Sequence, residues 1–341
     1  MTFAAVRAHR LYARRRGLFG KRRWWIVQRN YENLWPYADA WSALCTLGSL
    51  PKQEAALNVL DAMRRGLKSY SGHPDVLEAG GVAGFESVVT PPLGSGGDRY
   101  YDDNAWLGLA LVRHYELTGD PELLLLARRV FSFVRSGWSD DETWASPGGI
   151  RWKEPATNRS RNTCVNGPAS ELAARLHEKT GEPTYLEWAA RIYDWTRKAL
   201  SQPEGLYADQ ITPEGNRNGM IWSYNQGTMI GAGVLLHRLI GDSSYLRDSL
   251  ETASTYLDDR GASELLTQDP AFNAVFFRNL LLLDKEQSSD LYRSKAIAYG
   301  SAMWEQKRRR HGLFAGNGSP LNNAAAMIQL YALLAGAEPH A

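Results

Sequence analysis

Arg113-His114-Tyr115-Glu116-Leu117-Thr118-Gly119-Asp120-Pro121 ends one apolar helical run and leads into a second helical segment, Glu122 to Arg135. Glycine suits the end of the first helix and Asp-Pro the start of the second, so the stretch predicts two helices joined by a tight turn. The arrangement recurs 62 residues later at Gly181-Glu182-Pro183, and again 60 residues after that at Gly241-Asp242-Ser243. Each repeat is therefore a helical hairpin with a short turn at one end and a long connection at the other.

The two helices of a hairpin differ in how their apolar residues are distributed. The first is apolar almost all round, as in Gly227-Thr228-Met229-Ile230-Gly231-Ala232-Gly233-Val234-Leu235-Leu236, whereas the second is amphipathic, as in Trp188-Ala189-Ala190-Arg191-Ile192-Tyr193-Asp194-Trp195. Helices buried on all sides, each paired with a helix buried on one side, describe an inner ring inside an outer ring. We therefore predict an all-α (α/α)6 barrel of six inner and six outer helices.

The predicted helices account for most of the chain. The inner ones are 33–47, the run that starts at 106, 171–179, 228–239, 272–283 and 321–334, and the outer ones are 3–15, 53–68, 122–135, 185–200, 245–257 and 289–308. The segments 308–314 and Gly205-Leu206-Tyr207 each follow a predicted outer helix. Arg14-Arg15-Arg16-Gly17-Leu18-Phe19 nearly copies the segment 308–314, so the residues before it, 3–15, are assigned as the sixth outer helix. Because no strand pattern and no Pro- or Ser-rich linker is evident, we expect a single domain over residues 1–341.

Composition limits the function classes. The chain has 341 residues, 44% of them hydrophobic, and a net charge of +2, which gives no overall attraction to nucleic acid or membrane. Cys45 and Cys164 lie in predicted apolar helices without disulfide or metal-site spacing. The basic segment from Met1 to Arg16 has no apolar core of a secretory signal, so we expect a cytoplasmic, monomeric protein without cofactor or metal, and leave secretion by another route open.

Two adjacent carboxylates open one of the predicted inner helices. Gly97-Asp98-Arg99-Tyr100-Tyr101-Asp102-Asp103-Asn104-Ala105-Trp106 leads into a run too apolar for the surface, so the helix is predicted to begin near Asp102. A helix start needs one capping residue, and a second ionised Asp beside it suffers repulsion from the first. The pairs Asp140-Asp141 and Asp258-Asp259 stand in polar surroundings and indicate solvated charge. Asp102 and Asp103 are therefore the catalytic candidates.

The barrel topology divides the remaining polar and aromatic residues between two ends. The long connections lead into the inner helices, at the end where the Asp pair lies. Candidate substrate-binding residues at this end are Trp35, Asp39, Asn104, Trp106, Arg151, Trp152, Asn166, Asp209, Trp222, Tyr224 and Asn225. His114, His177 and His237 precede the short Gly turns at the opposite end, which indicates a structural role for all three.

Two carboxylates in a cleft lined by aromatic residues suit the cleavage of glycosidic bonds. One carboxyl group protonates the leaving oxygen, while the other attacks the anomeric carbon or activates water. Retaining enzymes hold the two groups about 5–5.5 Å apart, and inverting enzymes about 6.5–9.5 Å. Side chains of consecutive residues reach the shorter separation more easily, so the sequence favours retention. Because the two charges repel each other, we predict a raised pKa for Asp103 and a low pKa for Asp102.

Four segments of the chain resemble glycoside hydrolase family 76, in order along the sequence: Tyr100-Tyr101-Asp102-Asp103-Asn104-Ala105-Trp106, Gly148-Gly149-Ile150-Arg151-Trp152, Asn166-Gly167-Pro168-Ala169 and Tyr224-Asn225-Gln226-Gly227. That family contains bacterial endo-α-1,6-mannanases and related fungal cell-wall transglycosidases on an (α/α)6 barrel. The resemblance implies a retaining double displacement on α-mannan or manno-oligosaccharides, with Asp102 as nucleophile and Asp103 as acid/base.

Two alternative functions remain open at this point. A transglycosidase would use the same carboxylates but pass the glycosyl unit to a sugar acceptor. A catalytically silent carbohydrate-binding protein would keep the barrel and the aromatic residues without turnover, which the intact Asp pair disfavours. An endo-acting α-1,6-mannanase is the function that the sequence favours.

Overall fold

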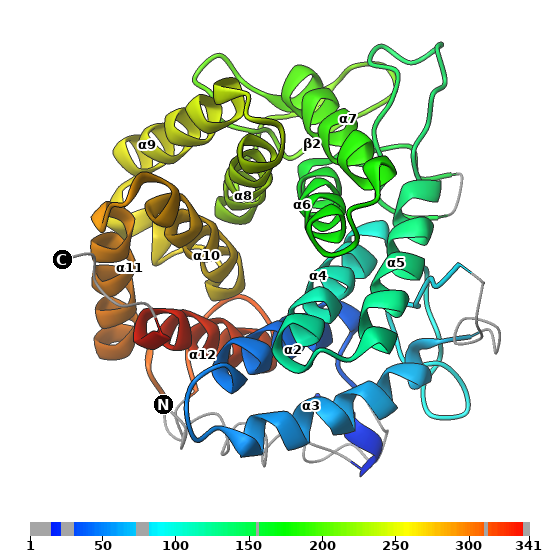
Figure 1. Ribbon diagram of the computed structural model, residues 1–341, viewed down its shortest axis with the longest axis vertical. Helices are drawn as coiled ribbons and strands as arrows, with labels where there is room; N and C mark the ends of the chain where they lie inside the picture. The colour runs from blue at the N-terminus through cyan, green and yellow to red at the C-terminus, as the bar shows by residue number, and fades with distance from the viewer. Residues whose placement is uncertain (1–14, 22–30, 73–81, 155–156, 310–312, 337–341) are drawn as a thin grey trace.

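The computed structural model of the protein describes residues 15–21, 31–72, 82–154, 157–309 and 313–336. Within these ranges the chain consists mainly of α-helices that alternate between an inner and an outer position (Figure 1). The inner helices are α2 (Leu34–Gly48), α4 (Tyr101–Thr118), α6 (Thr163–Thr180), α8 (Ser223–Ile240), α10 (Pro270–Gln287) and α12 (Pro320–Gly336). The described outer helices are α3 (Glu54–Leu67), α5 (Pro121–Ser136), α7 (Pro183–Leu200), α9 (Ser243–Leu265) and α11 (Leu291–Ala302).

The inner helices form a closed ring, which confirms the predicted (α/α)6 barrel. Each of them packs against the next one along the chain, and α12 packs back against α2 (Figure 1). Each described outer helix packs against the inner helix that precedes it. The sixth predicted outer helix, 3–15, lies outside the described residues except for Arg15, which begins a 3-10 turn, Arg15–Gly17, against α3.

The short turns of the hairpins form as predicted. Gly119, Gly181 and Gly241 adopt left-handed φ angles of 72°, 70° and 83° directly after α4, α6 and α8, and the N–H of each bonds a carbonyl four residues back. Asp120 and Asp242 then cap the following outer helices through their side chains. These local signals define the turns without help from the rest of the molecule.

The starts of some inner helices differ from the predicted bounds. The helix predicted over 171–179 begins at Thr163, because the fully buried turn around Asn166 contains polar residues and Pro168 that hide its helical pattern. Three two-residue strands, β1 (Arg161–Asn162), β2 (Gln210–Ile211) and β3 (Arg217–Asn218), form a small antiparallel sheet that was not predicted. Strands this short have no alternating pattern that a sequence can reveal.

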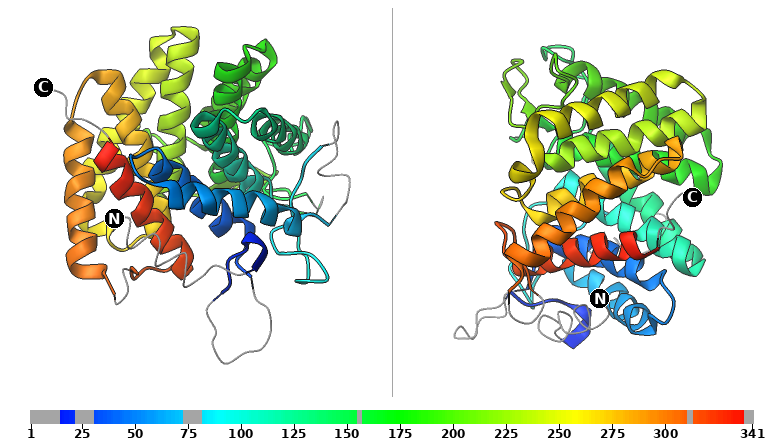
Figure 2. Two further views of the ribbon diagram at one scale, coloured as in Figure 1. Left: turned by 60° about the horizontal axis from the view of Figure 1, so that its bottom comes forward. Right: turned by 90° about the vertical axis from the view of Figure 1, so that its left-hand side faces the viewer.

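The two ends of the barrel differ in their connections. Figure 2 shows the long connections gathered at the end where the inner helices begin, with the short turns at the opposite end. Two of the repeated Gly-Leu-aromatic segments form an antiparallel bridge through their aromatic residue, Tyr207 with Ser201 and Phe314 with Arg308, and Gly20, directly after Gly17-Leu18-Phe19, forms one with Tyr31. None of the helices in the described ranges is both long and apolar enough to cross a membrane.

Candidate active site

A pocket of about 490 Å³ opens at the long-connection end of the barrel. It lies among the first turns of α2, α4, α8, α10 and α12, so residues far apart in the sequence share one cavity. We call it the Asp-pair pocket. Its lining residues are Lys21, Glu32, Asn33, Trp35, Pro36, Ser87, Tyr100, Asp102, Asp103, Trp106, Trp152, Tyr224, Phe272, Ser319 and Asn322.

The Asp pair lies in the first turn of α4, but neither residue caps the helix. The N-cap is Tyr100, which has extended backbone angles, and the N–H of Tyr101 bonds the carbonyl of Trp152 at 2.9 Å. Both carboxylates are therefore available to the pocket, which they line while remaining partly exposed. By contrast, Asp140 and Asp141 lie at the surface, with side chains 68% and 40% exposed.

The carboxylate of Asp102 is held by groups from three places in the chain. Its Oδ2 accepts a hydrogen bond from Trp152 Nε1 at 2.9 Å and a weaker one from Cys164 Sγ at 3.6 Å. Its Oδ1 accepts from the backbone N–H of Asp103 at 2.9 Å. These contacts fix the orientation of the carboxylate, as a nucleophile in a displacement reaction requires.

Burial raises the pKa of Asp102 to about 6, although the donors from Trp152, Asp103 and Cys164 act in the opposite direction. The sequence-based prediction of a low pKa for Asp102 is therefore wrong. The prediction considered only the repulsion between the two neighbouring charges, whereas the dominant effect on the pKa of Asp102 is desolvation by the surrounding protein.

Asp103 has the higher pKa of the pair. Burial raises the pKa of its carboxyl group well above the usual value, and the charges of Asp102 and Asp39 raise it further. The predicted direction for Asp103 is confirmed. Because the first proton leaves the better stabilised Asp102, the pair can hold one carboxylate and one carboxylic acid at the same pH.

Asp39 is not among the residues that line the Asp-pair pocket. It lies on α2, and burial raises its pKa to about 8 in spite of the nearby guanidinium groups of Arg278 and Arg113. Its Oδ2 is buried without a hydrogen-bond partner among the described groups. A carboxyl group that is protonated at neutral pH is a poor general base, and Asp39 places a negative charge near Asp103 only once the pH exceeds its own pKa of about 8.

Aromatic rings make up much of the pocket wall. The predicted residues Trp35, Trp106, Trp152 and Tyr224 all line it. Phe272, which the sequence indicated only as the start of an inner helix, lies between Tyr224 at 4.1 Å and Trp35 at 5.9 Å, measured between ring centroids. Such faces suit the apolar sides of pyranose rings.

Asn104 and Asn166 do not line the pocket but hold the long connections in place. Asn104 is fully buried and binds both the N–H and the carbonyl of Phe85, at 2.8 and 3.0 Å. Asn166 binds the N–H and the carbonyl of Ile150 in the same way, at 2.8 and 3.0 Å. Gln226 repeats the pattern, because its amide pairs with the backbone of Tyr207. Each of these amides belongs to the fourth residue of its inner helix. This repeated position is the sequence signal by which an amide that binds the backbone of a long connection could have been told from one that binds a ligand.

The four other predicted residues are not among those that line the Asp-pair pocket. Arg151 Nε donates a long bond of 3.5 Å to the carbonyl of Gly137. Asp209 accepts from Asn218 at 3.2 Å, and Asn225 is fully buried. Trp222 is the N-cap of α8 and lines a neighbouring pocket instead.

The three histidines assigned a structural role lie at or near the ends of the inner helices that the sequence predicted. His177 and His237 bond the carbonyls of Glu182 and Asp242 in the short turns, and His114 accepts from Trp41 Nε1 at 3.2 Å in the core. Cys45 and Cys164 are free and buried. The contact of Cys164 with Asp102 has no local sequence signal, since the two residues are 62 positions apart.

Comparisons with known proteins agree with this arrangement. The model of glycosyl hydrolase family 76 matches residues 23–291. Mannan endo-1,6-alpha-mannosidase DCW1 of Saccharomyces cerevisiae is 26% identical over 215 residues, which are 55% of this chain and 47% of the yeast protein. The corresponding protein of Candida glabrata is 31% identical over 165 residues, 44% of this chain and 36% of that protein. The chain thus spans about half or less of these curated relatives.

Two solved structures illustrate the similarity of fold. A family 76 mannosidase from Bacteroides thetaiotaomicron has a TM-score of 0.82 and 20% identity, over 97% of this chain and 98% of that one. The GH76A alpha-1,6-mannanase of Salegentibacter sp. HEL1_6 has a TM-score of 0.79 and 24% identity, over 97% of both chains. An inactive variant of the latter, with two consecutive aspartates replaced by asparagine, was solved in complex with alpha-1,6-mannotriose.

Proposed function

Because this chain belongs to glycosyl hydrolase family 76, we propose that it is an endo-acting hydrolase of α-1,6-mannosidic linkages in α-mannan, working with retention of configuration. The observation that carries the proposal is the Asp pair itself. Two consecutive carboxyl groups share one aromatic pocket, yet one is hydrogen-bonded and has a pKa of about 6, while burial and the charge of its neighbour raise the pKa of the other well above its usual range. Glycoside hydrolysis requires this division of roles.

In the first step, Asp102 attacks the anomeric carbon of the mannosyl residue at the cleavage point. Asp103 gives its proton to the glycosidic oxygen as that bond breaks, so the aglycone leaves as an alcohol and a mannosyl ester of Asp102 remains. The hydrogen bonds from Trp152 and Cys164 to Oδ2 orient the attacking carboxylate.

In the second step, Asp103 is a carboxylate and takes a proton from water. As that proton moves to Asp103, the water oxygen attacks the same carbon and the ester bond breaks, so that Asp102 leaves as a carboxylate and Asp103 is left protonated for the next cycle.

The relatives support the choice of substrate. The curated proteins that match are named mannan endo-1,6-alpha-mannosidases, and the Salegentibacter enzyme is named an alpha-1,6-mannanase. The loss of activity in that enzyme when two consecutive aspartates are replaced supports the catalytic assignment of Asp102 and Asp103. Trp35, Trp152, Tyr224 and Phe272 supply faces for the sugar rings.

The test is incubation with linear α-1,6-mannan, with the products sized over time. An endo-acting hydrolase gives a mixture of shorter oligosaccharides early in the digestion. The matched control is the double variant Asp102→Asn/Asp103→Asn, which keeps the shape of the pocket and should release nothing. Mannose as the sole early product, or equal activity of the control, would refute the proposal. Products longer than the starting oligosaccharide would instead indicate a transglycosidase.

A further inference from the structure

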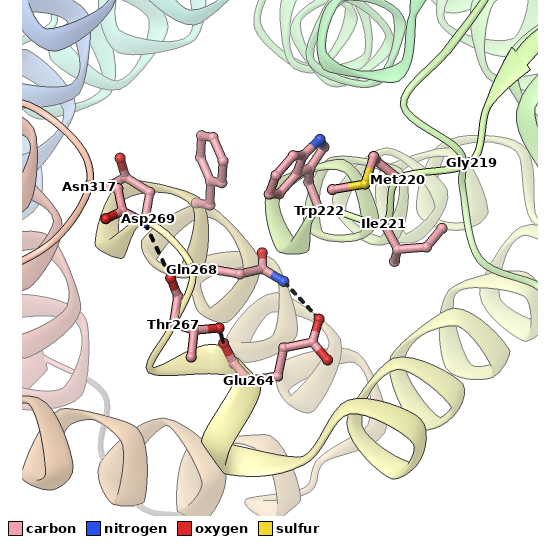
Figure 3. A pocket seen from close by; sticks show the side chains of 10 residues that line it. Gly219, Met220, Ile221, Trp222, Glu264, Thr267, Gln268, Asp269 and Asn317 are labelled. Carbon is pink, nitrogen blue, oxygen red and sulfur yellow. Dashed lines mark hydrogen bonds between the residues drawn. The ribbon is translucent and has the colours of Figure 1, made fainter.

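A second pocket, of about 410 Å³, lies beside the first at the same end of the barrel. We call it the Trp222 pocket. It is formed by the segment that leads into α8, the end of α9, the start of α10 and the segment that leads into α12. Figure 3 shows Met220 and Trp222 on one side of this pocket, with Asp269 and Asn317 across from them.

The two pockets share a wall. Phe272 lines both of them, and its ring contacts the rings of Trp222 and Tyr224, with centroid distances of 5.7 Å and 4.1 Å. Tyr224 belongs to the Asp-pair pocket. Phe272 is therefore the residue that a polymer occupying both pockets would have to cross.

The Trp222 pocket combines an aromatic face with polar groups, as carbohydrate sites do. Trp222 is partly exposed, and Met220 beside it is 49% exposed. Asn317 is exposed on the opposite wall, where its Nδ2 makes one long bond of 3.5 Å to the carbonyl of Thr267. The amide of Asn317 is thus positioned to exchange this weak bond for a sugar hydroxyl.

The floor of the pocket is preformed. Gln268 Oε1 accepts from the N–H of Ser223 at 2.9 Å, and its Nε2 donates to the hydroxyl of Tyr256 at 2.8 Å. These bonds tie the start of α10 to the start of α8, so the two walls keep a fixed separation. A volume of about 410 Å³ is at the lower end of the usual range of about 300–1,000 Å³ for ligand pockets, which suits one sugar residue.

We propose that the Trp222 pocket is a remote subsite that binds one pyranose residue of the polysaccharide, stacked on Trp222 and hydrogen-bonded by Asn317. The inference rests on the proposed function, since it takes the ligand to be part of the mannan cleaved at the Asp pair. The pyranose can come from two sources with the same chemistry: a distant residue of the main chain, or a side-chain substituent.

The test compares substrates that reach the Trp222 pocket with substrates that do not. The variants Trp222→Ala and Asn317→Ala are assayed on linear α-1,6-manno-oligosaccharides of increasing length and on a branched mannan of the same main-chain linkage. We expect kcat/KM to fall about five- to tenfold for Trp222→Ala and about two- to fivefold for Asn317→Ala on substrates that fill the subsite. On the shortest cleaved oligosaccharide the loss should be smaller. Because Trp222 also supports Phe272, Asn317→Ala gives the cleaner comparison.

Matched controls are available on the same molecule. Trp304→Ala removes another exposed tryptophan, and Asn216→Ala another exposed asparagine, and neither residue lines either pocket. Both controls should keep the parent's dependence on substrate length.

The outcomes separate the two proposals. A loss that grows with length on linear substrates assigns the subsite to the main chain, and a loss confined to branched mannan assigns it to a substituent. If both variants lose activity equally at every length, or not at all, while the parent cleaves mannan, the subsite assignment is wrong and the proposed function stands. If the parent cleaves none of these substrates, the proposed function is wrong, and the mannan subsite with it.

Discussion

The hydrogen bond from Trp152 to Asp102 provides the sharpest test of the catalytic assignment. Trp152→Phe keeps an aromatic ring in the pocket wall but removes the Nε1–H that lies 2.9 Å from Asp102 Oδ2. This donor stabilises the ionised form of Asp102. Its loss should therefore raise the pKa of that carboxyl group and move the acidic limb of the rate profile to higher pH.

The size of this shift follows from the strength of the bond. A hydrogen bond to a charged group contributes about 1.5–3 kcal/mol, and one pKa unit corresponds to about 1.4 kcal/mol. Taking the lower figure, because Asp102 is partly exposed and keeps two other donors, the pKa rises from about 6 to about 7. At pH 5.5 the ionised fraction then drops from about a quarter to about 3%, roughly eightfold.

The assay measures kcat/KM against pH, from 4 to 9, for the parent and the variant. Lost stacking on the sugar lowers kcat/KM by the same factor at every pH, whereas a lost hydrogen bond moves the acidic limb. Trp138→Phe is the control, because it removes an indole donor from the exposed carboxylate of Asp140 at 2.7 Å. An acidic limb that stays in place in Trp152→Phe would refute the role given to Asp102.

Asp102→Asn should abolish turnover on every substrate, whereas Asp103→Asn should still form the glycosyl-enzyme from an activated aryl mannoside, which needs little protonation; burst kinetics distinguish the two. Hydrolysis should release the α-anomer first, and proton NMR in the first minutes would detect early β-anomer, which would mean inversion. Cys164→Ala should move the acidic limb upward by less than Trp152→Phe, because the thiol contact is weak at 3.6 Å, and Cys164→Ser should restore the parent's profile. Burial alone would raise the pKa of Glu171, but nearby arginines hold that pKa at about 2, so the folded protein stabilises the ionised carboxylate. Glu171→Gln should therefore lower the free energy of unfolding by about 3–5 kcal/mol and the midpoint of thermal unfolding by about 5–15 °C near neutral pH. That stabilisation is present above the ordinary pKa of about 4.5 and is lost as the pH falls towards 2, so the deficit of the variant should shrink over this range, and a deficit that grows in acid would contradict the reasoning.

The sequence could reveal the barrel because its signals are local and repeated. A glycine such as Gly119 at the end of an apolar helix, followed by an N-capping Asp, defines a turn through bonds within a few residues. The difference between helices that are apolar all round and amphipathic ones then assigns each helix to its ring. The same kind of local signal predicted that Asp102 and Asp103 lie at the start of an inner helix.

The chemistry of the site depended on distant parts of the chain. Asp102 receives its donors from Trp152, 50 residues away, and Cys164, 62 residues away, and no periodicity reports such a contact. Its pKa could not be read from its neighbours in the sequence, since desolvation depends on everything packed around the carboxylate.

Residue type by itself also did not distinguish polar side chains that bind the backbone from those that can bind a ligand. Asn104 is a short polar residue beside the Asp pair, which made it a candidate for binding sugar, yet the fold uses its amide to satisfy the backbone of Phe85. The sequence thus determined which helices form the barrel and which carboxylates face its open end. Only the tertiary structure decided which polar side chains are hydrogen-bonded to the backbone and which remain available to a substrate, because the buried N–H and carbonyl groups of the long connections need hydrogen-bond partners.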